Sequence, residues 1–178
     1  MRTVFVALSG GVDSSVAAAL LKEARFDVVG AHIVCWDDCE LGKERRDALR
    51  VALQLGMPFS TFDFREEYKK HVFESMVQEY AQGRTPNPDV LCNRKMKFGV
   101  FLKKALEVGA DFIATGHYVR LRSSHGEQEL LEGKDKEKDQ SYFLWALRNW
   151  QLKHSLFPLG DYTKPQVCLL YTSPSPRD

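Results

Sequence analysis

The chain has 178 residues, of which 44% are hydrophobic and 28% are charged, and its formal net charge is +1. This composition is typical of one globular domain, and no run approaches the roughly 18 consecutive apolar residues that a membrane span needs. A net charge near zero argues neither for nor against nucleic-acid binding, so any basic surface must be local. The N-terminus leads directly into a strand-like segment without room for a signal peptide, and we expect a cytoplasmic protein.

Strand-like and helical segments alternate along the chain. The hydrophobic periodicity predicts strands at 4–8, 28–34, 59–64 and 112–115, helices at 12–21, 45–55, 66–82 and 94–108, and a hairpin from 118–122 and 127–131. This alternation predicts an α/β fold, with a parallel sheet and helices on both faces. Ligands bind beyond the carboxyl ends of the strands in such sheets, so we expect residues 9–15, 33–38, 63–64 and 116–117 to line one crevice.

The segment 168–178 departs from the periodicity and composition of the preceding chain. Its back-translation matches an adapter used in sequencing libraries, whereas a disordered polar tail would explain the composition but not the match. We therefore expect one domain over residues 1–167, followed by a non-native tail.

The four cysteines are too few and too irregularly spaced for a secreted disulfide scaffold. Cys35 and Cys39 form a C-x3-C pattern without a second pair at zinc spacing, so two incidental cysteines are the favoured interpretation. We predict no metal site built from protein ligands alone.

The first motif with chemical meaning is S-G-G-V-D-S-S at 9–15, between a predicted strand and a predicted helix. Backbone N–H groups at a helix N-terminus bind anions, and Gly10 and Gly11 let a phosphate approach the main chain. Asp13 would repel bare phosphate, which suggests a bridging Mg²⁺. The lysine of a Walker A motif is absent. A Gly-Gly turn with a helix cap is the alternative, but the full motif favours a phosphate loop.

The second motif is G-R-T-P-N-P-D-V-L-C-N at 83–93, a turn-rich segment stiffened by two prolines. We expect it to deliver Cys92 to the start of a helix, beside Arg94, Lys95 and Lys97. The helix dipole and these cations would lower the pKa of the thiol and favour a nucleophilic thiolate. A buried structural cysteine is the alternative, and the spacing alone leaves both open.

These motifs resemble those of known enzymes. The loop at 9–15 resembles the pyrophosphatase loop of the N-type ATP pyrophosphatases, which cleave ATP between the α and β phosphates and adenylate an oxygen of the substrate. The segment 83–93 is similar to the signature of the tRNA-specific 2-thiouridylase family of the MnmA type. Blocks at 114–118, 138–144 and 156–160 resemble the same family, so the resemblance covers residues 4–167. It implies a PP-loop ATP pyrophosphatase domain with an adenine-nucleotide α-hydrolase-like parallel sheet.

The resemblance also implies roles for individual residues. For ATP binding it indicates Ala7, Leu8, Ser9, Gly10, Gly11, Val12, Asp13 and Ser14, with Ile33 at the adenine end and Gly116 at the ribose or α-phosphate. For the target base it indicates Asn87, Pro88 and Asp89, and for other tRNA contacts His117, Lys138, Asp139 and Gln140. Taken alone, His117 could be a satisfied polar residue, 134–138 a solvated charge run and 87–89 a simple turn.

The implied reaction has two steps. ATP, with Mg²⁺, adenylates O2 of the wobble uridine in tRNA, and a persulfide from a sulfur-donor protein then supplies sulfur at C2 to give 2-thiouridine. The cysteine that matches Cys92 acts as the nucleophile and later forms a disulfide. The family's persulfide-carrying cysteine and two β-rich domains match nothing in this chain, and Cys168 is not assigned that role. We expect a sulfurtransferase that is incomplete for the full reaction and does not contact a membrane.

Two other functions stay open. Another PP-loop enzyme could adenylate a small molecule, although the segment 87–92 argues against it. A non-catalytic nucleotide- or metal-binding module, with Cys35 and Cys39 structural, belongs to a different class and would be recognised by metal analysis.

Overall fold

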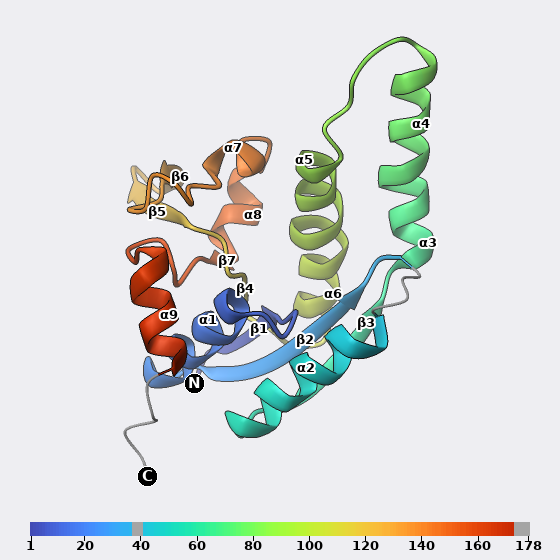
Figure 1. The fold of residues 1–178 in the computed structure, drawn as a ribbon. Coiled ribbons are helices and arrows are strands. Elements are labelled where there is room, and N and C mark those ends of the chain that lie inside the picture. Colours follow the sequence, from blue (N-terminus) through green and yellow to red (C-terminus); the bar gives the residue numbers. More distant parts are fainter. Residues whose placement is uncertain (37–40, 173–178) are drawn as a thin grey trace.

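The computed structural model describes residues 1–36 and 41–172. Five strands form one sheet: β1 (Thr3–Ala7), β2 (Asp27–Val34), β3 (Phe59–Asp63), β4 (Phe112–Ala114) and β7 (Ser155–Leu156). Their order is β3-β2-β1-β4-β7, and every neighbouring pair is parallel (Figure 1). The predicted parallel sheet is confirmed, whereas the short strand β7 was not predicted.

Helices cover both faces of the sheet, as predicted. On one face pack α1 (Val12–Glu23) and α2 (Leu41–Gln54), whose small residues Ala18 and Ala48 share a core cluster with Val4 and Val6 of β1. Phe5 points to the opposite face, because side chains alternate along a strand, and joins a second core cluster. The helical run α5 (Pro88–Cys92), η2 (Asn93–Phe101) and α6 (Leu102–Glu107) covers that face, where η2 is π-helical.

The helical run begins at Pro88, six residues before the predicted start. The side chain of Asn87 caps it, because its Oδ1 accepts hydrogen bonds from the backbone N–H groups of Asp89 (3.1 Å) and Val90 (3.2 Å). Proline is favoured at a first helical position, since the N–H it lacks would have no partner there. Cys92 therefore ends the first helical segment, and the prediction that it starts the helix was wrong.

The remaining elements surround this framework. The predicted helix at 66–82 consists of α3 (Arg65–Tyr68), the π-helical η1 (Lys69–Phe73) and α4 (Glu74–Ala81), which projects from the body of the molecule (Figure 1). The predicted hairpin forms as β5 (Val119–Ser124) and β6 (Glu127–Glu132). Three short helices follow: α7 (Ser141–Leu144), α8 (Asn149–Lys153) and α9 (Lys164–Thr172).

Helix α9 runs through the expected domain end at Val167, whose side chain is buried against α1. Residues 173–178 and Cys39 lie outside the described part of the chain, so the non-native tail stays a prediction. None of the described helices is both long and apolar enough to span a membrane.

Candidate functional site

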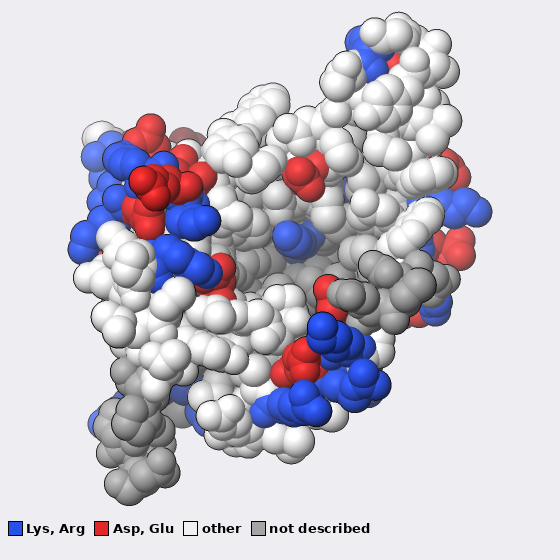
Figure 2. Space-filling model, viewed as in Figure 1, with Lys and Arg blue, Asp and Glu red and all other residues white. Residues whose placement is uncertain are grey.

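A cavity of about 580 Å³ opens where the strand order reverses, at the carboxyl ends of β1 and β4. Parallel sheets bind ligands at this switch point, and the volume suits a nucleotide-sized molecule. The hollow is visible in the middle of the face shown in Figure 2. Its lining includes these residues with predicted roles: Ala7, Leu8, Ser9, Asp13, Ser14, Ile33, Gly116, His117, Lys138, Asp139 and Gln140.

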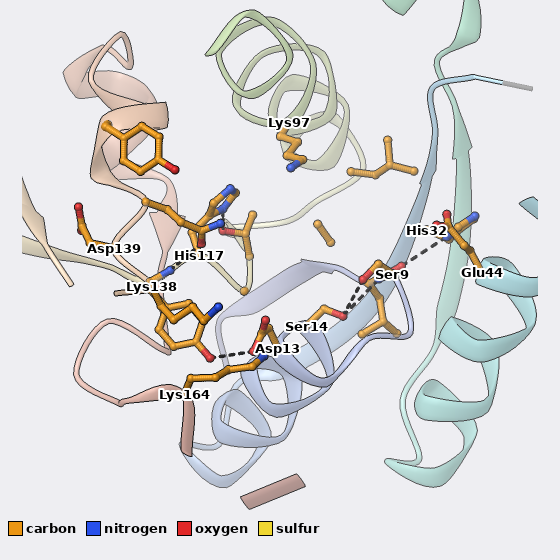
Figure 3. A pocket seen from close by; sticks show the side chains of 18 of the residues that line it. Ser9, Asp13, Ser14, His32, Glu44, Lys97, His117, Lys138, Asp139 and Lys164 are labelled. Carbon is orange, nitrogen blue, oxygen red and sulfur yellow. Dashed lines mark hydrogen bonds and ion pairs between the residues drawn. The ribbon is translucent and has the colours of Figure 1, made fainter. Parts of the chain in front are cut away.

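The N-terminus of α1 forms the floor of the cavity (Figure 3). Among the described residues no side chain caps this helix, so its first N–H groups are open to an acceptor. The Ser14 hydroxyl donates to the carbonyl oxygen of Gly11 (3.1 Å) and lies 3.2 Å from the Ser9 hydroxyl. Free amides, hydroxyls and a positive helix end together make a binding site for an anion.

Gly10 serves packing more than phosphate access. Its φ angle is +82°, in the left-handed region, and a Cβ atom there would lie 2.7 Å from the backbone nitrogen of Ala48 and the Cβ of Asp47 in α2. Gly10, Gly11 and Val12 are not part of the cavity lining. The glycine therefore lets the loop turn tightly against α2 and aims the α1 N-terminus into the cavity.

Asp13 is held by two residues that the sequence did not indicate. Its Oδ1 accepts a hydrogen bond from the Tyr118 hydroxyl (2.8 Å) and forms an ion pair with the Lys164 ammonium (2.6 Å; Figure 3). Burial and the neighbouring carboxylate raise the pKa of Tyr118, so the phenol stays protonated and donates. Lys164 lies 151 positions from Asp13, at the start of α9, and no local pattern links the two.

The chemistry around Asp13 fits a magnesium ion carried by phosphates. The described residues contain no group of three or more His, Cys, Asp or Glu that could cage a metal. Mg²⁺ is commonly held by one or two carboxylates plus substrate phosphates, and Asp13 beside the open α1 amides supplies one such carboxylate.

His117 lies in the cavity wall but is buried. Its Nδ1 lies 2.7 Å from the Thr115 hydroxyl, and its ring packs against Phe98 and Phe157. Burial, with a smaller contribution from Lys97, lowers the pKa of His117 to about 3. The imidazole is therefore neutral near pH 7 and can offer a hydrogen bond but no charge.

The segment that contains Lys138, Asp139 and Gln140 braces the far wall. The Asp139 carboxylate accepts hydrogen bonds from the Gly133 N–H (2.7 Å) and the Ser141 hydroxyl (2.7 Å). Gln140 Oε1 accepts one from the Tyr118 N–H (3.1 Å). Lys138 is exposed at the rim, so of these three residues it is the one whose charged group faces solvent.

Cys92 and the segment 87–89 lie beside the cavity without lining it. Cys92 is a half-buried free thiol that packs against the same core cluster as Cys35. Burial raises the pKa of Cys92 and outweighs the lowering effect of Lys97, while Asp89 raises it further. The expected depression of this pKa was wrong, because the burial of the thiol disfavours the thiolate more than the charge of Lys97 favours it. Burial also raises the pKa of Cys35, to about 12.

The predicted crevice included residues at the carboxyl end of β3 that do not line the cavity. Asp63 and Phe64 do not line the cavity, because β3 is an edge strand two positions from the switch point. Asp63 pairs instead with Arg65 (2.6 Å), and Phe64 is buried in the core. Residues 37 and 38 lie outside the described part of the chain.

Charged side chains gather at the rim of the hollow. In Figure 2, Lys, Arg, Asp and Glu cluster over the β5–β6 hairpin on the left and over α2 at the lower right, with both signs mixed. The surface between them is largely uncharged, with a basic side chain deep in the hollow. Positive charge on this face is therefore local.

Residues 2–172 match the family described as "tRNA methyl transferase HUP domain". The tRNA-specific 2-thiouridylase MnmA of Christiangramia forsetii is 49% identical over 179 residues, covering 94% of this chain and 45% of the relative. The protein of that name from Lactococcus lactis subsp. cremoris is 48% identical over 171 residues, covering 92% and 46%. The chain thus spans less than half the length of these relatives, and the family resemblance seen in the motifs is confirmed.

Two solved structures share the fold at low sequence identity. A protein described as a predicted subunit of tRNA methyltransferase from Methanocaldococcus jannaschii has a TM-score of 0.59 and 17% identity, covering 97% of this chain and 75% of that one. The U34-tRNA thiolase NcsA from Methanococcus maripaludis has a TM-score of 0.58 and 18% identity, covering 99% and 60%. At this identity the likeness establishes the fold alone.

Proposed function

The chain belongs to the tRNA methyl transferase HUP-domain family, and from this premise we propose that it is the ATP-binding catalytic domain of a tRNA 2-thiouridylase. Its relatives at 48–49% identity carry that name. The observation that carries the proposal is the uncapped N-terminus of α1, open to the cavity at the switch point. An anion site with one carboxylate beside it suits a nucleoside triphosphate that carries Mg²⁺ better than a neutral metabolite.

In the first proposed step, O2 of the wobble uridine attacks the α-phosphorus of ATP. The bond from that phosphorus to the oxygen bridging to the β-phosphorus breaks, and pyrophosphate leaves. The N–H groups at the start of α1 would bind the phosphate oxygens, whose charge they stabilise. Asp13 would hold Mg²⁺, which neutralises phosphate charge when bound, and Tyr118 and Lys164 fix the carboxylate in place.

In the second proposed step, the outer sulfur of a donor protein's persulfide bonds to C2 of the base, the C2–O2 bond breaks and AMP leaves. The Cys92 thiolate then attacks the donor cysteine's own sulfur, so that the S–S bond breaks, a disulfide forms between Cys92 and that cysteine, and the transferred sulfur stays on C2. Cys92 is the proposed nucleophile, and Asn87, Pro88 and Asp89 the proposed contacts to the target base. Ile33 and Gly116 would contact the adenosine portion, and Lys138 at the rim would contact a tRNA phosphate. The tRNA substrate implies a cytoplasmic location.

The test is pyrophosphate release from ATP and Mg²⁺ in the presence of tRNA. We expect release with a tRNA that carries uridine at the wobble position and background release with one that carries cytidine there. Asp13→Ala should lower the rate at least tenfold, whereas Asp27→Ala, an exposed carboxylate outside the cavity, should not change it. Release of ADP and inorganic phosphate, or equal rates with both tRNAs, would contradict the proposal.

A further inference from the structure

Lys97 is a cation of the cavity wall that the sequence linked to Cys92 and to which no role toward a ligand has been assigned. In Figure 3 the side chain of Lys97 points from η2 into the cavity. His117 lies beside it, and Ser9 and Ser14 lie across the cavity from it. Within residues 1–36 and 41–172, no hydrogen bond or ion pair engages its ammonium group, whereas Lys164 in the same cavity is paired with Asp13. An unpaired ammonium facing a cavity that binds anions is available to the ligand.

The winding of η2 places Lys97 on the side of the helix where Cys92 lies. In an α-helix, with 3.6 residues per turn, residues five positions apart are about 140° apart around the axis. In a π-helix, whose hydrogen bonds join positions i and i+5, they lie close to one turn apart. The π-helical segment starts directly after Cys92, so its winding brings Lys97 to the same side of the helix as the thiol, with which it interacts electrostatically.

Two features hold this unusual winding. The buried side chain of Gln151 in α8 donates from Nε2 to the carbonyl oxygens of Phe98 (2.5 Å) and Arg94 (3.2 Å). Gly99 leaves room for the Arg94 carbonyl, since a Cβ atom at that position would lie 2.9 Å from its oxygen. Widened turns of this kind often occur at functional sites. The winding that sets the position of Lys97 around the helix axis therefore has support both from α8 and from a glycine within η2.

We infer that Lys97 is a further catalytic residue, whose ammonium group binds the α-phosphate of the nucleotide in the cavity and stabilises the thiolate of Cys92 next to it. The inference rests on the proposed function for the identity of the nucleotide. One side chain would thus serve both steps of the reaction. Its ammonium group would bind the phosphate during adenylation and stabilise the nucleophile during sulfur transfer.

The groups that face Cys92 come from three elements. Lys97 and Asp89 lie on its own helical run, Cys35 directly follows β2, and Tyr68 lies in α3. Among these, Lys97 carries the positive charge. Its removal therefore leaves burial and Asp89, both of which favour the protonated thiol.

The test compares Lys97→Met, which keeps the apolar stem, with Lys97→Arg and with Lys103→Met, an exposed lysine in α6 outside the cavity. Two quantities are measured on the whole chain: the pH midpoint of Cys92 alkylation by iodoacetamide, followed by mass spectrometry, and the dissociation constant for ATP with Mg²⁺. Lys97→Met should raise the midpoint by roughly one pH unit and weaken ATP binding about tenfold or more. Lys97→Arg should retain most of both properties, and Lys103→Met should match the unsubstituted chain.

Failure of this inference differs from failure of the proposed function. If the unsubstituted chain binds ATP and Lys97→Met changes neither quantity, or only one of them, the linking role is wrong while the function stands. If the unsubstituted chain does not bind ATP, the proposed function falls and so does phosphate binding by Lys97. Equal loss in Lys97→Arg and Lys97→Met would show that shape rather than charge matters, which also overturns the inference.

Discussion

The Asp13 carboxylate shows how single residues build this site. Its backbone lies in the first turn of α1, where a negative charge interacts favourably with the helix dipole. The Tyr118 hydroxyl and the Lys164 ammonium both contact the same oxygen, Oδ1. In residues 1–36 and 41–172 no hydrogen bond or ion pair engages the other oxygen, so the carboxylate is oriented before a nucleotide binds and keeps one oxygen for a ligand.

Tyr118→Phe should remove one of these restraints without opening the core. The ring packs in a cluster with Val16 and Leu159, so only the hydrogen bond to Asp13 is lost. Hydrogen bonds to charged groups contribute about 1.5–3 kcal/mol, and we expect the free energy of unfolding in urea to fall by about 1.5–2 kcal/mol. Tyr162→Phe, a ring packed against the same cluster, is the control and should change it by less than about 0.5 kcal/mol. Equal effects of the two substitutions would remove the assigned role of the Tyr118 hydroxyl.

His117 makes stability depend on pH. Burial lowers its pKa from 6.5 to about 3, so between these values the unfolded chain binds a proton that the folded chain does not. The contribution of His117 to the free energy of unfolding is therefore fully present above pH 6.5. It is lost as the pH falls toward 3, by up to about 1.4 kcal/mol per pH unit. Urea unfolding at several pH values should give a shallower dependence for His117→Asn than for the unsubstituted chain. His125→Asn, in the exposed hairpin turn, should leave the dependence unchanged. Parallel curves for His117→Asn and the unsubstituted chain would contradict the assignment.

Among the elements, the π-helical segment η2 depends most on a distant partner. Gln151 in α8 satisfies the carbonyl oxygens of Phe98 and Arg94, and its Oε1 accepts a hydrogen bond from the Arg148 N–H (2.8 Å). One buried amide side chain thus connects α8 to the helix that carries Cys92. A helix sequence alone does not indicate such a connection.

Gln151→Leu should leave these three backbone groups without their partner in a buried place. Unsatisfied buried polar groups cost about 1–3 kcal/mol, so the free energy of unfolding should fall by about 2–3 kcal/mol. Gln54→Leu, an exposed glutamine in α2, should change it by less than about 0.5 kcal/mol. Denaturant titration of both variants measures the difference. A Gln151→Leu variant as stable as Gln54→Leu would show that the winding of η2 does not need this bond.

The elements predicted from the sequence were those whose signal is local. The alternation of Val4, Phe5 and Val6 specifies a strand buried on both faces, and the motif at 9–15 lies wholly between that strand and the next helix. The two-residue strand β7 is too short to show a period. The start of α5 was missed because the two prolines indicate a turn, while the capping by Asn87 decides for a helix. Contacts between distant positions, such as Lys164 with Asp13, leave no local pattern.

At the scale of the whole molecule, charge is balanced and the order of the strands places the site. The net charge is +1, and on the face with the cavity both signs mix around the rim. The switch point between β1 and β4 brings the phosphate loop, Gly116 and the wall with Lys97 together from distant parts of the chain. The fold thus gathers a small number of cations around one cavity, and the described residues form no broad basic surface on this face.

Binding to tRNA should accordingly depend on salt with a shallow slope. Few phosphate contacts release few counterions, so affinity should fall roughly ten- to fiftyfold between about 50 and 200 mM salt. Filter binding over this range measures the slope, and Lys138→Ala at the rim should reduce it, whereas Lys22→Ala, on the far end of α1, should not. Affinity that is independent of salt would contradict local electrostatic binding.

The central claim is that this cavity transfers AMP from ATP to the wobble uridine before sulfur arrives. The most direct measurement uses the Cys92→Ser variant with ATP labelled in the α-phosphate, Mg²⁺ and tRNA with uridine or cytidine at the wobble position. Removal of the nucleophile should block the second step and leave the first intact. We predict labelled AMP attached to the uridine tRNA and none attached to the cytidine tRNA. Label on both tRNAs, or on neither while labelled ADP accumulates, would contradict the account.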